Sequence, residues 1–145
     1  RFKDQLMSEL SGSEQQLAGI ARALTQQPEL LLLDEPTSHL DITHQVQVLN
    51  VLQQLNQETG LSVLMVIHDL NLASEYCDRL ILVNQGRIHT QGKPEEVLTF
   101  QHIEDVYQTV VVTQNNPLSG KPAVFLASGK VLREIQERLA SGQKS

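Results

Sequence analysis

The stretch LLLLDEP, residues Leu30–Pro36, is the strongest indication of the fold of this chain. It begins two residues after Pro28, which ends the preceding helical pattern. A short apolar run without alternation, bounded in this way, predicts a strand buried on both faces, as in a parallel sheet. The acids Asp34 and Glu35 stand at the C-terminal end of this predicted strand, the edge at which open parallel sheets bind their ligands.

A second apolar run, Leu61–Ile67, predicts another buried strand that ends at His68-Asp69. Between the two strands, Asp41 can cap a helix of about residues 42–58, and Gly60 is a good stop for it. The two strands therefore bring carboxylates and an imidazole to one sheet edge. Apolar residues before Asp-Glu also match the Walker B pattern of nucleotide hydrolases, in which the Asp holds the Mg²⁺ shell and the next carboxylate orients the attacking water.

The rest of the chain predicts a mixture of short helices and strands around these two. Upstream, residues 1–9 are expected to be helical, and Leu10–Ser13 is a loop whose Ser caps a helix of about residues 13–26, with Glu14 in its first turn. Downstream, Asn84-Gln85-Gly86 predicts the turn of a hairpin. The remaining expected elements are strands 79–83, 87–90, 109–113 and 123–127 and helices 70–76, 94–98, 101–107 and 130–140.

Composition excludes several classes of function. The 145 residues carry 11 Lys+Arg against 17 Asp+Glu, a net charge of −6, which argues against a broad nucleic-acid surface. The single cysteine, Cys77, rules out an internal disulfide and is expected in a packed core. No apolar run reaches the roughly 20 residues that cross a bilayer, and no signal peptide opens the chain, so we expect a soluble, cytoplasmic protein.

Several blocks together resemble an ATP-binding cassette (ABC) ATPase. They are LSGSEQQ at Leu10–Gln16, LLLLDEP at Leu30–Pro36, TSHLD at Thr37–Asp41 and HDLNLA at His68–Ala73, in the family's order and spacing. HDLNLA and the later Gly86–Thr99 stretch most resemble importer ATPases for iron–siderophore, haem and cobalamin. The resemblance implies an α/β, P-loop NTPase-like fold with a mostly parallel sheet flanked by helices. Residues 1–27 would end the helical subdomain, and residues 28–145 would be the C-terminal part of the ATPase core with an extension.

The resemblance also assigns roles to individual residues. Glu35 and His68 would be catalytic, Glu35 as general base or water-orienting carboxylate and His68 as the sensor of the γ-phosphate. Asp34 would bind Mg²⁺ through water, and Asp41 would reach across a dimer interface. The signature loop, Ser11, Gly12 and Ser13, would touch the γ-phosphate of ATP held by a partner subunit. The implied cofactors are ATP and Mg²⁺, and the implied partners are a second ATPase subunit, in a homodimer, and transmembrane permease subunits at the cytoplasmic face of the membrane.

The sequence departs from the family pattern in two ways. Ser13 stands where the signature usually has a second Gly, and we expect this change to be tolerated and to weaken the contact with ATP mildly. Glu14 takes the fifth position, where the family usually has Gln or Glu. There is no G-x-x-x-x-G-K-[ST] phosphate loop, and the family's glutamine loop is missing as well. The chain therefore resembles the C-terminal part of an ABC ATPase, cut within the helical subdomain, and whether Arg1 is its natural start stays open. We expect it to be inactive alone and to expose apolar faces and strand edges.

Other interpretations remain open at this point. The chain could be a non-catalytic half that supplies signature residues to a complete ATPase, or it could come from an ABC ATPase that is not a transporter, although its acidic charge argues against a nucleic-acid partner. Asp41 could be a plain helix cap. His39, His44, His89 and His102 show no metal-ligand spacing and are expected on the surface.

Overall fold

The computed structural model describes residues 6–133, except for the side chain of Ser13. The chain divides into two compact units, residues 1–68 and 69–145, and each is described by itself. Among the described residues, no helix combines the length and the apolar character needed to cross a membrane. The predicted boundary between residues 27 and 28 remains a prediction.

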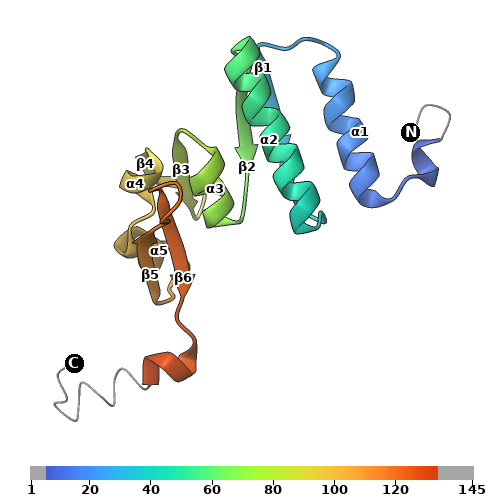
Figure 1. Ribbon diagram of the computed structural model, residues 1–145. Coiled ribbons are helices and arrows are strands. Elements are labelled where there is room, and N and C mark those ends of the chain that lie inside the picture. The colour runs from blue at the N-terminus through green and yellow to red at the C-terminus, as the bar shows by residue number, and fades with distance from the viewer. Residues whose placement is uncertain (1–5, 134–145) are drawn as a thin grey trace. The chain divides into compact units, whose positions relative to one another are not determined.

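The described part of the first unit, residues 6–68, contains two α-helices and a parallel pair of strands. The pair joins β1 (Leu30–Asp34) to β2 (Ser62–Val66), with Leu30 opposite Ser62 and Asp34 opposite Val66. The 3₁₀ turn Met7–Glu9 and α1 (Gly12–Leu24) precede the pair, and α2 (Ile42–Thr59) connects its strands (Figure 1). Asp34 therefore ends β1 beside the end of β2.

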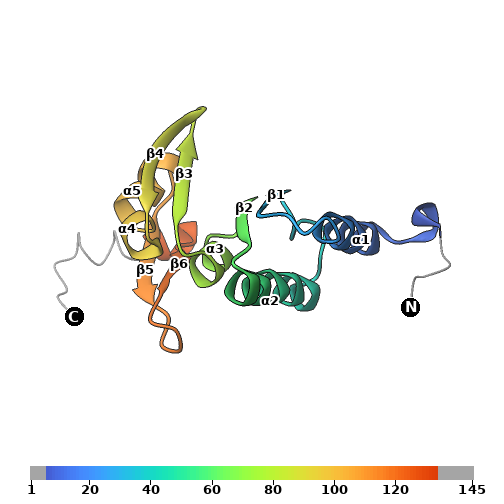
Figure 2. The same cartoon turned by 90° about the horizontal axis from the view of Figure 1, so that it is seen from above.

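Helix α2 covers one face of this two-stranded sheet, in both views of the molecule (Figures 1 and 2). The core on that face contains Leu31 of β1 together with Val48 and Leu52 of α2. Side chains of α1, among them Leu17 and Ile20, pack against the same core. Apolar residues at helical spacing in α1 and α2 thus bury their stripes against a single layer of strands.

The other face of the β1–β2 pair is exposed, which corrects the prediction of strands buried on both sides. Its apolar side chains are between 51% and 65% exposed. They are Leu30, Leu32, Leu64 and Val66. The physical reason is that each strand has only one partner and no described element of this unit covers the second face. The expectation of an exposed apolar sheet face is confirmed for the described residues.

Over residues 69–126, the second unit packs two antiparallel hairpins with three short helices. After α3 (Leu70–Tyr76), β3 (Leu80–Asn84) pairs with β4 (Arg87–Gly92). Helices α4 (Pro94–Val97) and α5 (Phe100–Tyr107) follow, and β5 (Val111–Asn115) then pairs with β6 (Pro122–Leu126). These elements enclose a core of their own, made of Leu82, Val97, Leu98, Ile103, Val111 and Val124.

The expected mostly parallel sheet is wrong for the described residues, which contain one parallel pair and two antiparallel pairs. The alternation of helices and strands keeps the α/β character. The hairpin turn gives a physical reason for part of this difference. Gln85 and Gly86 both have positive φ, 48° and 73°, and two left-handed residues in succession fit the twist of an antiparallel pair.

Most predicted elements are confirmed to within a few residues. Gly60 ends α2 in the left-handed conformation with a φ of 73°, as expected of a glycine stop. The expected helix over residues 1–9 is limited, among described residues, to the turn Met7–Glu9. The expected helix 130–140 begins as a helical turn over residues 129–133, and its remainder lies outside the described residues.

Candidate functional site

The backbone of Glu35 is left-handed, with a φ of 46°, directly after β1. A left-handed residue with a side chain costs on the order of 1–3 kcal/mol and persists only when its surroundings fix it. The carbonyl oxygen of Glu35 accepts three hydrogen bonds. Ser38 donates two of them, from its N–H at 3.1 Å and its Oγ at 2.8 Å, and Gln16 Nε2 of α1 donates the third at 2.9 Å. Together with the fully buried Pro36, these bonds hold the strained turn.

Gln16 and Ser38 are site residues that the sequence analysis missed. Both act on the backbone of Glu35 and not on a ligand, so a search for chemical groups does not find them. Ser38 lies three residues after Glu35 in a loop, a spacing typical of side-chain-assisted turns. Gln16 lies 19 residues before Glu35, and its sequence position carries no comparable signal.

The side chains of Glu35 and His68 meet, although 33 residues separate them. His68 Nε2 lies 2.7 Å from Glu35 Oε1, with the histidine side chain 74% exposed and the glutamate 43% exposed. This contact joins the loop after β1 to the residue two positions after β2, because parallel strands end at the same sheet edge. The predicted juxtaposition of a carboxylate and an imidazole is therefore present, in a place that a ligand from solvent can reach.

Asp34 and Asp69 behave differently from this pair. Asp34 is the last residue of β1 and is exposed, so its carboxylate is available to water or to a hydrated cation. Asp69 caps α3, and its Oδ1 accepts hydrogen bonds from the N–H groups of Asn71 at 2.8 Å and Leu72 at 3.0 Å. Of the four polar residues at the strand ends, Asp69 thus has a structural partner that accounts for it.

The signature loop begins α1 with a capping box. The Ser11 N–H and Oγ both donate to Glu14 Oε2, at 2.9 and 2.8 Å, and the Glu14 N–H donates to Ser11 Oγ at 3.4 Å. Gly12 is exposed, and a Cβ built on it would meet nothing within 4 Å. The first N–H groups of a helix have no intrahelical partner, which favours an anion at this end.

Asp41 is the N-cap of α2, as one of the two interpretations held. Its carboxylate accepts the His44 N–H at 3.0 Å and lies 2.7 Å from His44 Nδ1. The hydrogen bond from the backbone of His44, followed by that from its ring, lowers the pKa of Asp41 below its usual value. An additional role for Asp41 across a dimer interface remains a prediction.

The residues fit the implied ligands in part. An exposed carboxylate at a strand end suits a hydrated Mg²⁺, and Gly12 at a helix start suits a phosphate. Ser11 fits a phosphate less well in this arrangement, because its N–H and hydroxyl are already bonded to the Glu14 carboxylate. Among the described residues, no group of three or more His, Cys, Asp or Glu side chains is placed to hold a metal directly.

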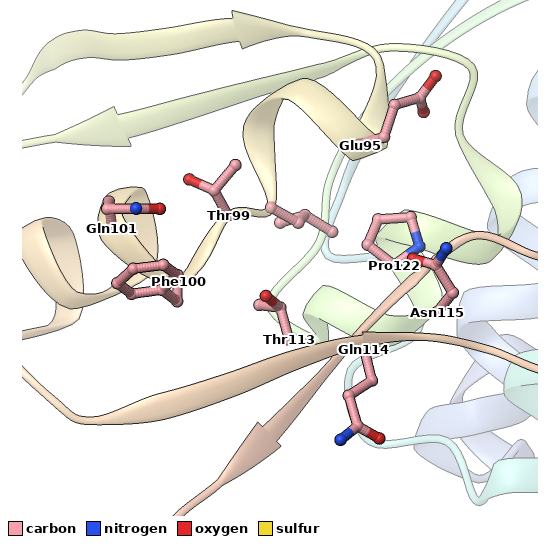
Figure 3. A pocket seen from close by; sticks show the side chains of 9 residues that line it. Glu95, Thr99, Phe100, Gln101, Thr113, Gln114, Asn115 and Pro122 are labelled. Atoms are coloured by element: carbon pink, nitrogen blue, oxygen red, sulfur yellow. The ribbon is translucent and has the colours of Figure 1, made fainter.

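A shallow pocket of about 270 Å³ lies in the second unit, apart from all predicted site residues. Figure 3 shows that Phe100 and Thr99 line it on one side and Thr113 and Asn115 on the other. Its wall is a mixture of apolar and uncharged polar groups, with Glu95 as its one carboxylate among the lining residues. No cluster of groups in this wall suggests chemistry.

Comparison with solved structures identifies the fold. An inward-facing putative metal-chelate type ABC transporter matches 85% of this chain and 49% of its own, with 28% identity and a TM-score of 0.74. The dimeric ATP-binding cassette MJ0796, described in a post-hydrolysis state with ADP and Pi, matches 59% of this chain and 37% of its own, with 37% identity and a TM-score of 0.56. The fold is therefore that of part of an ATP-binding cassette.

Sequence comparison agrees. The family model described as ABC transporter matches residues 1–38. The petrobactin import ATP-binding protein FpuD of Bacillus anthracis is 41% identical over 94% of this chain and 50% of its own length. The ferric enterobactin transport ATP-binding protein FepC of Escherichia coli is 42% identical over 83% and 45%, and the hemin import ATP-binding protein HmuV of Photobacterium damselae is 44% identical over 84% and 48%. The chain belongs to the ABC transporter family of ATP-binding proteins, and it spans about half the length of these curated relatives.

Proposed function

We propose that this chain is the C-terminal part of an ATPase subunit that powers an ABC importer. The observation that carries the proposal is the geometry of Glu35: a left-handed backbone held by three hydrogen bonds, with its carboxylate 2.7 Å from His68. Strain of this kind collects at functional sites, where a side chain has to be aimed. Here it aims a carboxylate into a place that solvent reaches.

In this proposal, Glu35 orients and activates the water that attacks the terminal phosphate of ATP. A carboxylate fixed at a strand end can accept a proton from that water. His68 Nε2 lies 2.7 Å from the same carboxylate, and His68 would exchange this contact for a hydrogen bond to a phosphate oxygen when nucleotide binds. Asp34 would hold the hydration shell of Mg²⁺, and the bound ion would neutralise charge on the phosphate oxygens.

Ser11, Gly12 and Ser13 would complete the nucleotide site of a second ATPase subunit. The start of α1 offers backbone N–H groups and the positive end of the helix dipole. The Glu14 carboxylate repels an anion at this helix start and already accepts the hydrogen bonds that Ser11 can donate. The loop would therefore bind ATP more weakly than the same loop with an uncharged residue at position 14. Glu14→Gln in the full-length protein should lower the KM for ATP by a few-fold, because it removes that charge and keeps the capping geometry.

The proposed partners are a second copy of the subunit and a pair of permease subunits. MJ0796, a similar cassette, is dimeric, and the metal-chelate type relative is a transporter. Asp41 would lie at the interface between the two copies. The subunit would then sit at the cytoplasmic face of the membrane through its permease. The proposed cargo is a metal chelate such as a ferric siderophore, haem or cobalamin, supported by the petrobactin, enterobactin and hemin relatives.

The decisive experiment is Glu35→Gln in the full-length protein. The substitution keeps the shape of the side chain and removes the base, so we expect kcat for ATP hydrolysis to fall by about 100-fold or more, the usual contribution of a positioned general base. Binding of a fluorescent ATP analogue should stay within about twofold of the unmodified protein. Steady-state hydrolysis and titration of the analogue measure the two quantities.

Glu29→Gln is a matched control, since Glu29 lies just before β1, is exposed and is outside the proposed site. It should leave kcat unchanged. An unchanged kcat in Glu35→Gln would refute the proposed role of the glutamate.

Stimulation of ATP turnover by one metal chelate and not by others, in the full-length protein assembled with its permease, would identify the cargo.

A further inference from the structure

Two histidines of the second unit lie against each other, although they belong to different elements. His89 is part of β4, and His102 is in the first turn of α5. The centres of their rings are 5.5 Å apart, and the ring planes stand at 82° to each other. The spacing of these residues in the sequence gave no sign of a metal site, and it is the fold of this unit that brings the two imidazoles together.

His89 lies at an irregularity in the pairing of β3 with β4. Thr90 lies opposite Leu82, but Ile88 lies opposite Val83, so His89 is an extra residue of β4 in this register. An extra residue of this kind is a β-bulge, which breaks the alternation of side chains and can re-aim one of them. Bulges are frequent beside binding and active sites. The position of His89 is thus a second observation, independent of the contact between the rings.

One nitrogen of the His102 ring is fixed by a backbone carbonyl. His102 Nδ1 lies 3.1 Å from the carbonyl oxygen of Val97, a residue that is 1% exposed. A carbonyl oxygen can only accept, so Nδ1 carries the hydrogen and Nε2 keeps its lone pair. Histidines that bind metals almost always donate their second ring N–H in this way, which fixes both the tautomer and the ring. The His102 N–H also donates to Thr99 Oγ1 at 3.3 Å, which holds the backbone of this residue.

The separation of the two rings suits one shared metal ion. A tetrahedral zinc ion with metal–nitrogen distances of about 2.0–2.1 Å places the centres of two bound imidazole rings about 5 Å apart. The observed separation of 5.5 Å is close to this value, so small rotations of the side chains would be enough. His89 is exposed and His102 is half-buried, and an ion can therefore reach them from solvent.

The donor atoms indicate which ions fit. Imidazole nitrogen suits zinc, copper and nickel, whereas Mg²⁺ and Ca²⁺ prefer oxygen ligands. Helix α5 carries Glu104 and Asp105 and no Lys or Arg, so its own charge favours a cation, while Arg87 of β4 opposes one. In the part of the chain that the structure describes, no third His, Cys, Asp or Glu completes a metal-binding group with this pair. Water would fill the other coordination positions.

We propose that His89 and His102 together bind one zinc ion and that this ion joins β4 to α5. With two protein ligands, the site has fewer than the four of structural zinc sites or the three of catalytic ones. Binding is therefore reversible and follows the zinc concentration around the protein. The site uses none of the residues proposed for ATP hydrolysis, so the failure of either proposal leaves the other standing.

Zinc titration of the full-length protein, without nucleotide or Mg²⁺, tests the proposal with two variants. His102→Asn keeps a side-chain N–H that can donate to the Val97 carbonyl, and it removes Nε2. His89→Phe keeps a ring against His102 and offers no ligand. Each variant should bind zinc at this site at least about tenfold more weakly, because loss of an outer-shell partner alone typically costs about 10- to 100-fold. Isothermal titration calorimetry measures the number of ions and their affinity.

His39→Asn is the matched control. His39 is an exposed histidine of the first unit, and its φ of 63° is one that asparagine tolerates. Its substitution should leave zinc affinity within about twofold of the unmodified protein. The double variant of His89 and His102 should bind no more weakly than either single variant, because the two residues act on one ion. A large excess of Mg²⁺ should not displace the zinc.

Three results would overturn the proposal. The first is an unmodified protein that binds no zinc more tightly than millimolar. The second is an affinity that neither substitution changes. The third is a loss in only one of two folded variants, because the rings would then not share an ion. Circular dichroism shows whether each variant folds; if one does not, the other decides, with a loss of affinity supporting the site and an unchanged affinity overturning it.

Discussion

The two units of this chain complete their cores to different degrees. The second unit, residues 69–145, closes a core of six buried residues between two hairpins and short helices. The first unit, residues 1–68, covers only one face of its strand pair and leaves Leu32 and Leu64 more than half exposed on the other. All predicted site residues lie in this first unit. The groups proposed for catalysis are thus in the part of the chain with the less complete core.

The local geometry of the site therefore does not depend on a closed core. The turn at Glu35 is held by hydrogen bonds from Ser38 and Gln16, which are local or come from α1. The contact between Glu35 and His68 follows from the parallel register of β1 and β2. Directional bonds and strand register are sufficient to aim these side chains, while apolar burial governs how stable each unit is.

The largest expected effect is the loss of core packing in the second unit. Ile103 is 1% exposed, so Ile103→Ala in the 145-residue chain should lower the free energy of unfolding by about 2–5 kcal/mol. Leu32→Thr is the comparison in the first unit. Leu32 is 65% exposed, and threonine keeps strand propensity, so the change should stay within about 0.5 kcal/mol. Urea unfolding measures both; equal losses would mean that the face of Leu32 is covered in solution.

A smaller effect is expected at the cap of α3. Asp69 accepts two N–H groups, so Asp69→Ala should lower the free energy of unfolding by about 1 kcal/mol. Asp69→Asn keeps a side-chain oxygen at the same place and should lose only a few tenths of that amount. Thermal unfolding of the three proteins checks this order. If Asn were as damaging as Ala, the charge of Asp69 and not its hydrogen bonds would be responsible.

The thiol of Cys77 should react slowly in the folded protein. Burial raises the pKa of Cys77, and the charge of Asp78 adds to this rise while Lys121 opposes it. A raised pKa means less thiolate at pH 8, and thiolate is the reactive form. The neutral thiol of Cys77 therefore contributes to the free energy of unfolding below the unfolded pKa, and this contribution is lost as the pH rises through the folded pKa. The rate of modification by a disulfide reagent, measured from pH 7 to 10 with and without urea, tests this; equal rates would contradict it.

The smallest effect is expected at Asp41 in the first unit. Its lowered pKa means that the cap contributes stability above the unfolded pKa, and that this contribution is lost as the pH falls through the folded value, below 3.8. His44→Ala removes the hydrogen bond from the ring, the weaker of the two that lower this pKa, and leaves the one from the backbone. The pKa of Asp41 should then rise part of the way towards its ordinary value, as NMR titration of the carboxyl carbon can measure. A pKa that does not move would show that the ring contributes nothing.

Local signals explain why much of the fold could be predicted from the sequence. Asp41 and Gly60 mark the start and end of α2 because a cap oxygen and a left-handed glycine are needed there whatever surrounds the helix. The strand ends at Asp34 and before His68 follow from apolar runs that stop at polar residues. These rules depend only on residues close together in the sequence, so they apply before any tertiary contact is known.

The errors concern properties that depend on distant parts of the chain. The four leucines of Leu30–Leu33 show that both faces of the strand can pack against apolar groups. They do not show which elements cover each face, so the prediction of burial on both faces was wrong. The left-handed turn at Glu35 has no marker such as glycine, and Gln16 reaches it across 19 residues. Likewise, no sequence signal predicts the hydrogen bond that the Val124 N–H donates to Asn71 Oδ1, 53 residues earlier in the chain.

The left-handed conformation of Glu35 sets stability against activity at a single position. Glycine adopts a φ of 46° without the steric cost that a Cβ imposes. A directed-evolution campaign that selects for heat resistance alone would therefore favour glycine at position 35 and discard the carboxylate with it. Campaigns of that kind on this family need turnover as a second criterion, because a strained residue of the loop is also the one proposed to do the chemistry.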